Sequence, residues 1–457
     1  MLQYKKVKWP LSLLRRLKAT QIIAITFLLI IMTGMFLLIL PVSSRSHVSC
    51  GFLTALFTAT SATCVTGLVV YDTWLKWSGF GQVVILGMIE LGGLGFMSAA
   101  SMIIFMLRKR FGLRQRLVMA QSVGYENSGG VVRLQLLILR GSLIVEGLGA
   151  VALTLRFLAD FDLLTALKLG IFHSVSAFCN AGFDILGFIP GNSGISSYAT
   201  DPAICITLMA LIVIGGLGFI VWEDILRAHK FRRFSVYSRL VILTTAALII
   251  SGALIICALE WNNPDTMGTM STGDKVLSGF FQSITSRTAG FTAIDQTLFT
   301  DASKVVTMFL MLVGGSSGST AGGIKTVTLV VIFLFMVARA RGRGTVSVFN
   351  RTIPQEQVLN ALTIFGIMIF LAVFGGAFIC ATSPVGFVDA LFESISALAT
   401  VGLSANTTAK LSVASRILVI IYMYFGRVGV LTISMGFLAG NHAEERYHYA
   451  ETKLLIG

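Results

Sequence analysis

The sequence predicts an all-α membrane protein of four tandem helix–pore-loop–helix repeats, with eight transmembrane helices and four re-entrant pore helices around a pseudo-fourfold pore. Two observations predict this class. The first is composition: 55% of the residues are hydrophobic and 12% are charged, with a mean hydropathy of +0.85, whereas soluble domains are about 25% charged. The second is a glycine that recurs four times along the chain, which is typical of an internal repeat.

The recurring glycines are separated by 115, 108 and 112 residues, and each ends a short apolar segment that contains Ser or Thr. They are Gly67, Gly182, Gly290 and Gly402, and each is followed by a bulky apolar residue. Glycine permits backbone conformations that other residues avoid, so it lets a chain approach an ion closely. A ring of loops whose carbonyl oxygens replace the water around an ion is one way to build a cation filter. The spacing therefore predicts a central ion path.

Each repeat is expected to hold a spanning helix, a short apolar helix, the glycine and a second spanning helix. A spanning helix needs about 20 apolar residues, and a shorter apolar stretch indicates a re-entrant segment. Non-helical backbone at membrane depth is tolerated only where it is buried or lines water. The expected helices are 19–40, 51–63 and 81–107; 134–157, 166–178 and 203–228; 237–259, 276–287 and 304–341; and 356–382, 387–399 and 413–440.

Charge gives the expected orientation. The net charge is +14, and the basic residues cluster at the N-terminus and in 108–116, 227–239 and 339–351, opposite segments richer in acids. This is the positive-inside pattern, so it indicates orientation rather than nucleic-acid binding. The basic start precedes a span without a cleavage pattern, which predicts a retained first helix. The expected organisation is a cytoplasmic segment 1–18, then repeats 19–116, 117–234, 235–345 (with a gate loop) and 346–457 (with a C-terminal tail).

A second signature follows each repeated glycine. The segment from Gly92 to Phe96 (GGLGF) recurs from Gly215 to Phe219, and glycines at 314–315 and 426 occupy the matching places. Small residues often allow close helix packing. In the first two repeats, packing alone explains these glycines as well as a functional role does. In the third repeat, ten small residues at 314–323 cannot form a stable helix facing lipid, because glycine weakens helices and freed backbone groups need partners. This segment is expected to face the inner cavity or a neighbouring helix.

No constellation for covalent chemistry is evident. The five histidines are scattered, the six cysteines lack metal-site spacing, and no Ser/His/Asp set occurs. The segment from Gly318 to Thr326 is a near miss of a phosphate-binding loop, but no strand precedes it and Ile324 is inserted before Lys325. We expect a protein that is not an enzyme and that holds no cofactor.

The joint pattern resembles the TrkH/KtrB/HKT superfamily of potassium transporters over nearly the whole chain. It rests on the four glycines, the four repeats, the glycine-rich break in repeat three and Arg427 in the last helix. The KtrB branch is the most similar, because the segment before the first span is too short for the two extra helices that TrkH-type members usually carry. The resemblance implies potassium translocation across a bacterial cytoplasmic membrane, with both termini cytoplasmic and sodium as a candidate activator.

By this resemblance, four strands form a selectivity filter that binds K⁺, and the glycine-rich segment forms a gate with two basic residues. The filter strands are Val65-Thr66-Gly67, Asn180-Ala181-Gly182, Thr288-Ala289-Gly290 and Thr400-Val401-Gly402. The gate is Gly314, Gly315, Ser316, Ser317, Gly318, Ser319, Thr320, Ala321, Gly322 and Gly323, with Lys325 and Arg427. Arg427 is expected either to form an electrostatic barrier or to hold the loop closed by hydrogen bonds to its carbonyls.

The resemblance also implies partners: the lipid bilayer, a second copy in a homodimer, and a cytosolic nucleotide-binding ring of the RCK type, similar to KtrA or KtrC. No nucleic acid is expected. The basic loops would face the ring, or they serve topology alone.

Several charged residues keep two interpretations. Arg287 is a brace to a nearby acid or an ion-repelling charge, while Asp295 and Glu393 are caps, ion-pair partners or cation-attracting groups. Glu90, Glu146 and Glu223 pack against polar neighbours or line the ion path. The rival function is an alternating-access secondary cation transporter, because glycine-interrupted helices are also its signature. Four parallel repeats favour the pore.

Overall fold

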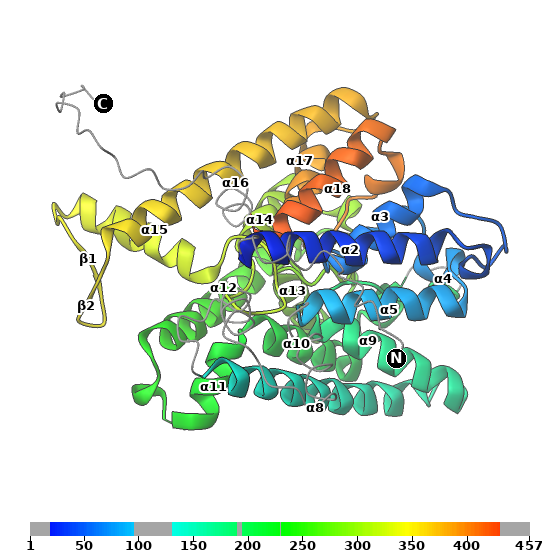
Figure 1. Ribbon diagram of the computed structural model, residues 1–457, viewed down its shortest axis with the longest axis horizontal. Helices are drawn as coiled ribbons and strands as arrows, with labels where there is room; N and C mark the ends of the chain where they lie inside the picture. Colours follow the sequence, from blue (N-terminus) through cyan, green and yellow to red (C-terminus); the bar gives the residue numbers. More distant parts are fainter. Residues whose placement is uncertain (1–18, 96–129, 190–193, 229, 430–457) are drawn as a thin grey trace, which may run out of the picture.

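A computed structural model describes residues 19–95, 130–189, 194–228 and 230–429 of the 457-residue chain. Nearly all regular structure in these ranges is helical (Figure 1). The N-terminal segment 1–18, the basic loop 108–116, the C-terminal tail and the far ends of the helices expected at 81–107 and 413–440 lie outside the described residues.

The helices follow a recurring order in which a long helix precedes a shorter one, a glycine loop and another helix. The four sets are α2 (Ala19–Ile39), α3 (Phe52–Thr63) and α5 (Gly79–Gly93); α8 (Val131–Phe157), α9 (Leu163–Phe178) and α10 (Pro202–Gly216); α12 (Val236–Glu260), α13 (Thr272–Thr285) and α14 (Asp301–Leu312); and α16 (Gln355–Thr382), α17 (Phe387–Leu398) and α18 (Val413–Val428). The remaining elements include α4 (Thr73–Lys76), α11 (Phe219–Ala228), α15 (Thr326–Ala340), β1 (Val346–Val348) and β2 (Arg351–Ile353).

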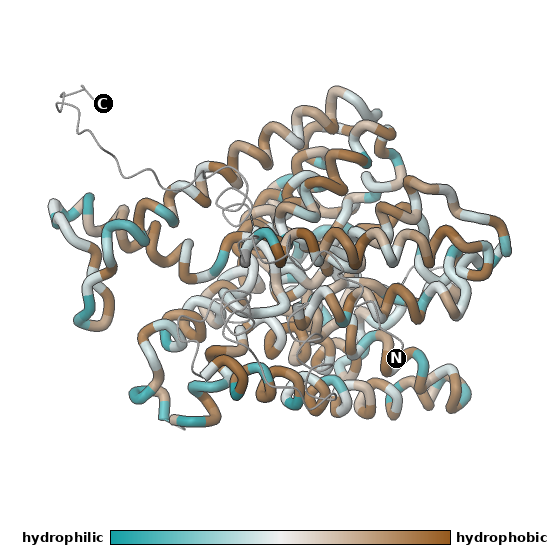
Figure 2. Tube along the Cα trace, viewed as in Figure 1, coloured by the Kyte–Doolittle hydropathy of each residue, from teal (hydrophilic) through white to brown (hydrophobic). Residues whose placement is uncertain are grey.

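The long helix that opens each set is suited to a membrane. In the described part of the chain, α2, α8, α12 and α16 are the four helices long and apolar enough to cross one, and a bent pair, α10 and α11, makes a fifth if counted as one span. Only 28–33% of their most apolar windows is buried inside the protein. Figure 2 shows hydrophobic residues along these helices. Such an apolar outer surface is stable only against lipid or another protein.

Two of the expected helices end and resume within the described residues. The helix expected at 203–228 ends at Gly216 and resumes at Phe219 after a bend of 93°, where Gly218 has a φ of 93°. The helix expected at 304–341 ends at Leu312 and resumes at Thr326. Both breaks coincide with glycine clusters, because glycine has the least preference for helix and the most freedom outside it.

The shorter helices α3, α9, α13 and α17 form the interior. Each packs against the long helix that precedes it, and the residues of its last turns are buried. Asp162 and Ser271 cap α9 and α13 by accepting hydrogen bonds from backbone N–H groups of the first turn, which satisfies donors that a helix leaves free. Because their last turns are buried, the C-termini of all four helices lie in the core.

One part of the fold extends beyond this core. Helix α15, the β1–β2 hairpin and the N-terminal part of α16 lie at one end of the molecule, and α16 runs from there back to the core (Figure 1). They have a separate small apolar cluster, which comprises Val331, Ile332, Ala338, Val346, Val358 and Ala361. The hairpin carries part of the basic loop 339–351.

Candidate ion path formed by four glycine loops

Each repeated glycine follows the C-terminus of a buried helix and lies on a strand that folds back against it. Thr66 N, Ala181 N and Val401 N donate to the carbonyl oxygens of Ser61, Ser176 and Ser396 at 2.8, 2.7 and 2.8 Å. The third strand has one residue fewer between the matching helix residue, Thr285, and its glycine, and there Ala289 N donates to Thr285 O at 2.9 Å. The C-terminal end of a helix carries partial negative charge, so four such ends lie at the bases of the strands.

The four strands share an unusual backbone. The residue two before each glycine has a positive φ, at 56°, 59°, 66° and 52° for Val65, Asn180, Thr288 and Thr400. The glycines have positive φ as well, but the residues between them do not. Three of the four strained residues are β-branched, for which this conformation is a genuine outlier. Strain of this kind persists only where the surroundings impose it, and it concentrates at functional sites.

The glycines meet in a closed ring. A Cβ added to Gly67 would overlap the carbonyl oxygen of Ala181, and one on Gly182 would overlap that of Ala289. In the same way Gly290 packs on the carbonyl of Val401, and Gly402 packs on that of Thr66. Each strand therefore contacts the next, and the fourth contacts the first. Only glycine fits these four places, because any side chain would strike the neighbouring backbone.

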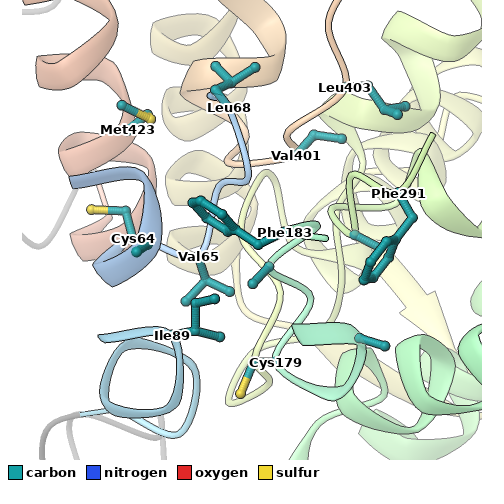
Figure 3. Packing of buried hydrophobic residues seen from close by; sticks show 14 of the residues in the cluster. Cys64, Val65, Leu68, Ile89, Cys179, Phe183, Phe291, Val401, Leu403 and Met423 are labelled. Atoms are coloured by element: carbon teal, nitrogen blue, oxygen red, sulfur yellow. The ribbon is translucent and has the colours of Figure 1, made fainter. Parts of the chain in front are cut away.

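Apolar and polar anchors hold the strands from behind. The residues that follow the glycines, Leu68, Phe183, Phe291 and Leu403, are at most 1% exposed, and Figure 3 shows them on the loops around one another. The hydroxyls of Ser176 and Thr285 donate to the carbonyl oxygens of Phe183 and Phe291 at 2.7 and 2.8 Å. Glu393, which is fully buried, accepts hydrogen bonds from Ser404 at 2.7 Å and from Thr408. Glu393 therefore braces the loop after Gly402.

A cavity of about 410 Å³ adjoins the ring and is lined by all four glycines. Three acids line it as well: Asp72, Asp184 and Asp295. Burial, with a further contribution from the charge of Asp72, raises the pKa of Asp184 to about 7. Asp295 caps a short 3₁₀ helix, Gln296–Leu298, by accepting a hydrogen bond from Thr297 N at 2.9 Å. The cavity thus presents carboxyl groups to anything that approaches the ring from this side.

The glycine-rich segment 314–323 lies against the bases of two of these strands. A Cβ on Gly314 would meet the side chain of Thr288, and one on Gly322 would overlap the hydroxyl of Thr400. The segment is docked on the end of α10, where Ser316 N donates to Gly216 O at 3.1 Å and Thr320 N to Gly215 O at 3.3 Å. It is therefore held at the end of the strands opposite the glycine ring.

Three cationic side chains hold this segment through its carbonyls. Lys325 Nζ donates to Ala321 O at 2.9 Å, and Arg287 Nη2 donates to Gly314 O at 3.0 Å. Arg427 donates to Thr320 O and also to Gly92 O and Gly93 O on α5, the last at 2.9 Å. Arg287 therefore braces a carbonyl, whereas the sequence suggested an acid. Arg427 on α18 therefore links α5 to the glycine-rich segment.

Two glutamates that the sequence marked separately are neighbours. Glu90 on α5, Glu146 on α8 and Cys179 at the end of α9 place their ligand atoms within 4.8 Å of one another. The thiol lies 3.6 Å from Glu90 Oε2 and 4.0 Å from Glu146 Oε1. Glu223 lies on α11 and is not in this group. Sequence spacing did not predict the cluster, because its members belong to three helices that only the packing of the folded chain brings together.

Comparison with known proteins agrees with this architecture. Residues 4–444 match the sequence profile of the TrkH family, described as a cation transport protein. The chain belongs to the TrkH family. It is 38% identical to the potassium/sodium uptake protein NtpJ of Enterococcus hirae, over 97% of this chain and 98% of that protein. It is 35% identical to the Ktr system potassium uptake protein B of Bacillus subtilis, over 97% of each chain.

A solved structure extends the likeness to the fold. The crystal structure of the potassium transporter TrkH from Vibrio parahaemolyticus superposes with a TM-score of 0.72, over 95% of this chain and 86% of that one, at 17% identity. The resemblance to the TrkH family and its KtrB branch is therefore confirmed. This TrkH family member is a multi-pass membrane transporter of the bacterial type, not an enzyme.

Proposed function

We propose that this TrkH family member is a potassium/sodium uptake transporter that conducts potassium through the ring of glycine loops. In this proposal, potassium leaves its water for the carbonyl oxygens of 65–67, 180–182, 288–290 and 400–402. Two relatives that match nearly the whole chain are named for potassium uptake, and one of them for sodium as well. The presence of glycine in all four strands favours potassium over sodium by resemblance to the family.

The observation that carries the proposal is the closed ring of contacts. Each glycine packs on the carbonyl of the next strand, so four carbonyl-bearing strands surround one axis. The sign of φ alternates within each strand, and in this proposal the alternation turns successive carbonyl oxygens toward the ion. The neighbouring cavity carries three carboxyl groups, which attract cations rather than anions.

The gate in this proposal is the segment 314–323 with Lys325 and Arg427. It lies at the strand bases, and opening it requires that the hydrogen bonds of Arg427 and Lys325 to Thr320 O and Ala321 O break. The two interpretations of Arg427, electrostatic barrier and latch, are compatible, because the side chain that latches the loop also places positive charge beside the path.

Assembly and regulation follow the family. We propose eight spans, four re-entrant pore helices, cytoplasmic termini and a homodimer in the bacterial cytoplasmic membrane. A relative belongs to a Ktr system, which supports a cytosolic RCK-type ring as the partner that pulls the gate aside. The exposed arginines of 339–343 are suited to face it. Sodium activation of transport belongs to the same proposal.

The second candidate function is an alternating-access carrier. The breaks between α10 and α11 and between α14 and α15 favour it, because interrupted helices form midplane sites in such transporters. In a carrier, a labelled ion on one side exchanges with an ion on the opposite side through a saturable cycle. Flux through an open pore does not require an ion on the opposite side. The four-way ring of glycines favours the pore.

The decisive experiment is rubidium flux into proteoliposomes, with sodium as competitor. We compare the wild type with Gly290→Ser, whose added side chain would strike the carbonyl of Val401 at a position with positive φ. We expect the wild type to select rubidium over sodium and the variant to lose this selectivity.

Gly366→Ala is the matched control, because it adds a Cβ on α16 with no heavy atom within 4 Å. It should transport as the wild type does. If Gly290→Ser selects as well as the wild type, or if no cation moves even with an RCK-type ring added, the four glycines serve packing alone.

A further inference from the structure

Arg287 breaks the quasi-symmetry of the four strands. It lies three residues before Gly290, where the other strands have Cys64, Cys179 and Ala399 before their own glycines. The other residues are small and apolar or weakly polar, so one strand out of four has a long cationic side chain at its base. The difference requires a physical reason, because a buried charge is costly unless it is paired or hydrogen-bonded.

Within the residues that the structure describes, Arg287 has no acid as an ion-pair partner. A serine on each of three pore helices sets the register, because Ser174, Ser283 and Ser394 donate to the carbonyls of Glu146, Ile249 and Ala372. Ile249 therefore occupies the place that Glu146 has beside Cys179. Arg287 is 7% exposed, and none of the ion pairs in the described part of the chain includes it.

The guanidinium is only partly satisfied. Its Nη2 donates to Gly314 O at 3.0 Å, the first carbonyl of the glycine-rich segment. Its Nε is buried and has no protein partner. On α12, the hydroxyl of Thr245 is in the same condition, and Thr245 is 5% exposed. Buried polar groups in native proteins are nearly always paired with protein or with ordered water.

Both unsatisfied residues line one small cavity. Its volume is about 10 Å³, and its walls include Arg287, Thr245, Asn180, Gly216 and Gly315. This is close to the volume that one water molecule needs, and a buried water requires at least two polar partners. The walls come from the second and third filter strands, from α12, and from the two glycine breaks that pack together.

We propose that one water molecule is bound in this cavity by Arg287 Nε and the Thr245 hydroxyl, and that Arg287 is a positioning residue coupling the third strand to the glycine-rich segment. The inference rests on the proposed function for the roles of strand and segment. Arg287 directly precedes Thr288, so a shift of Gly314 that moves the guanidinium also moves the strand. The water fixes the other side of the guanidinium to α12.

A lysine cannot replace this arrangement. The guanidinium is a planar fork whose nitrogens donate in different directions, whereas the lysine ammonium is a single point on a flexible chain. We expect Arg287→Lys to keep the charge but to lose either the contact with Gly314 or the contact with the water. Filter and segment would then no longer be held in one geometry.

The test measures two properties: the electron cryomicroscopy density in the cavity, and the selectivity of flux for rubidium over sodium. High-resolution electron cryomicroscopy of the wild type in lipid nanodiscs should show density in the cavity within hydrogen-bond distance of Arg287 Nε and Thr245 Oγ1. Thr245→Val, which keeps the shape but removes the hydroxyl, should lose that density. In rubidium flux with sodium as competitor, both Thr245→Val and Arg287→Lys should lower the selectivity ratio several-fold, and Arg287→Lys should also raise flux without a cytosolic partner.

Thr307→Val is the matched control. Thr307 is another fully buried threonine whose hydroxyl has no protein partner, but it lies on α14 and does not line the cavity. It should leave the ratio unchanged. The ratio does not depend on how much protein folds, so a variant that merely destabilises the chain would lower flux without changing it.

Three results would overturn the inference. They are an empty cavity in the wild type, a bromide ion in place of water when bromide replaces chloride, and an unchanged selectivity ratio in both variants. The density test does not need transport, so it separates this inference from the proposed function. If the wild type conducts no cation but the water is present, the conduction proposal fails while the water site stands.

Discussion

At the residue scale, the basic side chains near the ring act on backbone carbonyls. Arg427, Lys325 and Arg287 each donate to a carbonyl oxygen between residues 314 and 321. A carbonyl carries only partial negative charge, so these contacts hold the segment without neutralising the cations. The same residues can therefore latch the segment and repel a cation that arrives at it.

Replacing Arg427 by glutamine tests the latch. Gln is shorter and uncharged, so Arg427→Gln should lose the contacts that join Thr320 O to α5 and should raise rubidium flux measured without a cytosolic partner. Arg416→Gln is the control, since Arg416 lies on the same helix and donates to Ala409 O instead. Equal partner-independent flux in Arg427→Gln and the wild type would rule out the latch.

Asp184 predicts a pH dependence of uptake. Burial and the charge of Asp72 raise its pKa to about 7, so this carboxyl group gains its charge between about pH 6 and 8. A charged carboxylate in the cavity concentrates cations. Uptake at subsaturating rubidium should therefore increase as the external pH rises through 7, and Asp184→Asn should flatten this increase. Asp265→Asn, in an exposed turn, should not.

The raised pKa of Asp184 also makes the stability of the folded protein depend on pH. The folded state binds this proton more tightly than the unfolded chain, so the contribution of Asp184 favours folding at low pH and is lost as the pH rises toward 7. Asp184→Asn should thus stabilise the protein relative to the wild type at pH 8 and not at pH 4. A thermal melting series across this range measures the difference, and a variant destabilised at both pH values would contradict it.

At the scale of elements, the two helix breaks satisfy one another. The break in α10–α11 leaves Gly216 O free, and Ser316 N of the other break donates to it at 3.1 Å. In return, Phe219 N at the start of α11 donates to Gly318 O at 2.8 Å. Non-helical backbone inside a membrane protein needs such partners. Neither break is explained without the other.

A second feature of the elements is the contact of α5, α10 and α18 with the C-terminal ends of α3, α9 and α17. A Cβ on Gly92, Gly215 or Gly426 would overlap the carbonyl oxygen of Thr63, Phe178 or Leu398, respectively. Each of these carbonyls lies at the C-terminus of α3, α9 or α17, four residues before a repeated glycine. Close packing through these glycines, which the sequence suggested, therefore bears directly on the bases of the strands.

We expect Gly215→Ala to destabilise the protein by about 1–3 kcal/mol, the usual cost of overpacking. Gly87→Ala on α5 meets nothing within 4 Å and should stabilise by up to about 1 kcal/mol, because alanine favours helix over glycine. Thermal unfolding in one detergent, with both variants side by side, measures the contrast. A Gly215→Ala variant as stable as Gly87→Ala would show that α10 does not press on the end of α9.

At the scale of the whole molecule, closure of the ring depends on all four sets of helices. The chain brings Gly402 back to Thr66 across more than three hundred residues. Contacts between sets support this closure, such as the ion pair at 2.8 Å between Lys304 on α14 and Asp389 on α17. An ion bound in the ring would contact every set at once.

Potassium should therefore stabilise the whole protein. A ligand that binds only the folded state adds about 2.7 kcal/mol to the free energy of unfolding when its concentration is one hundred times its dissociation constant. The melting temperature in detergent should rise with potassium when choline keeps the ionic strength constant, and should rise less in Gly290→Ser. A melting temperature that depends on ionic strength alone would indicate that no ion is held by the ring.

Much of the architecture could be predicted from local pattern. Hydrophobic runs predicted the long helices such as 134–157, and the glycine spacing located the four loops. Places where pattern and structure differ are those where backbone conformation is set by distant neighbours. The run 203–228 is apolar enough for one helix, but it bends at Gly216 to meet the segment 314–323. The cluster of Glu90, Glu146 and Cys179 was not predicted, since no sequence spacing relates its three helices.

The linear chain was enough to predict the membrane class, the positions of the glycines and the family, because hydropathy, spacing and residue identity are all properties of the chain alone. The folded arrangement was needed to show that each glycine packs on the carbonyl of the next strand, and that Arg287 donates to Gly314 rather than to an acid. The physical reason is that hydrogen bonds and close contacts depend on distances across helices, which no periodicity records.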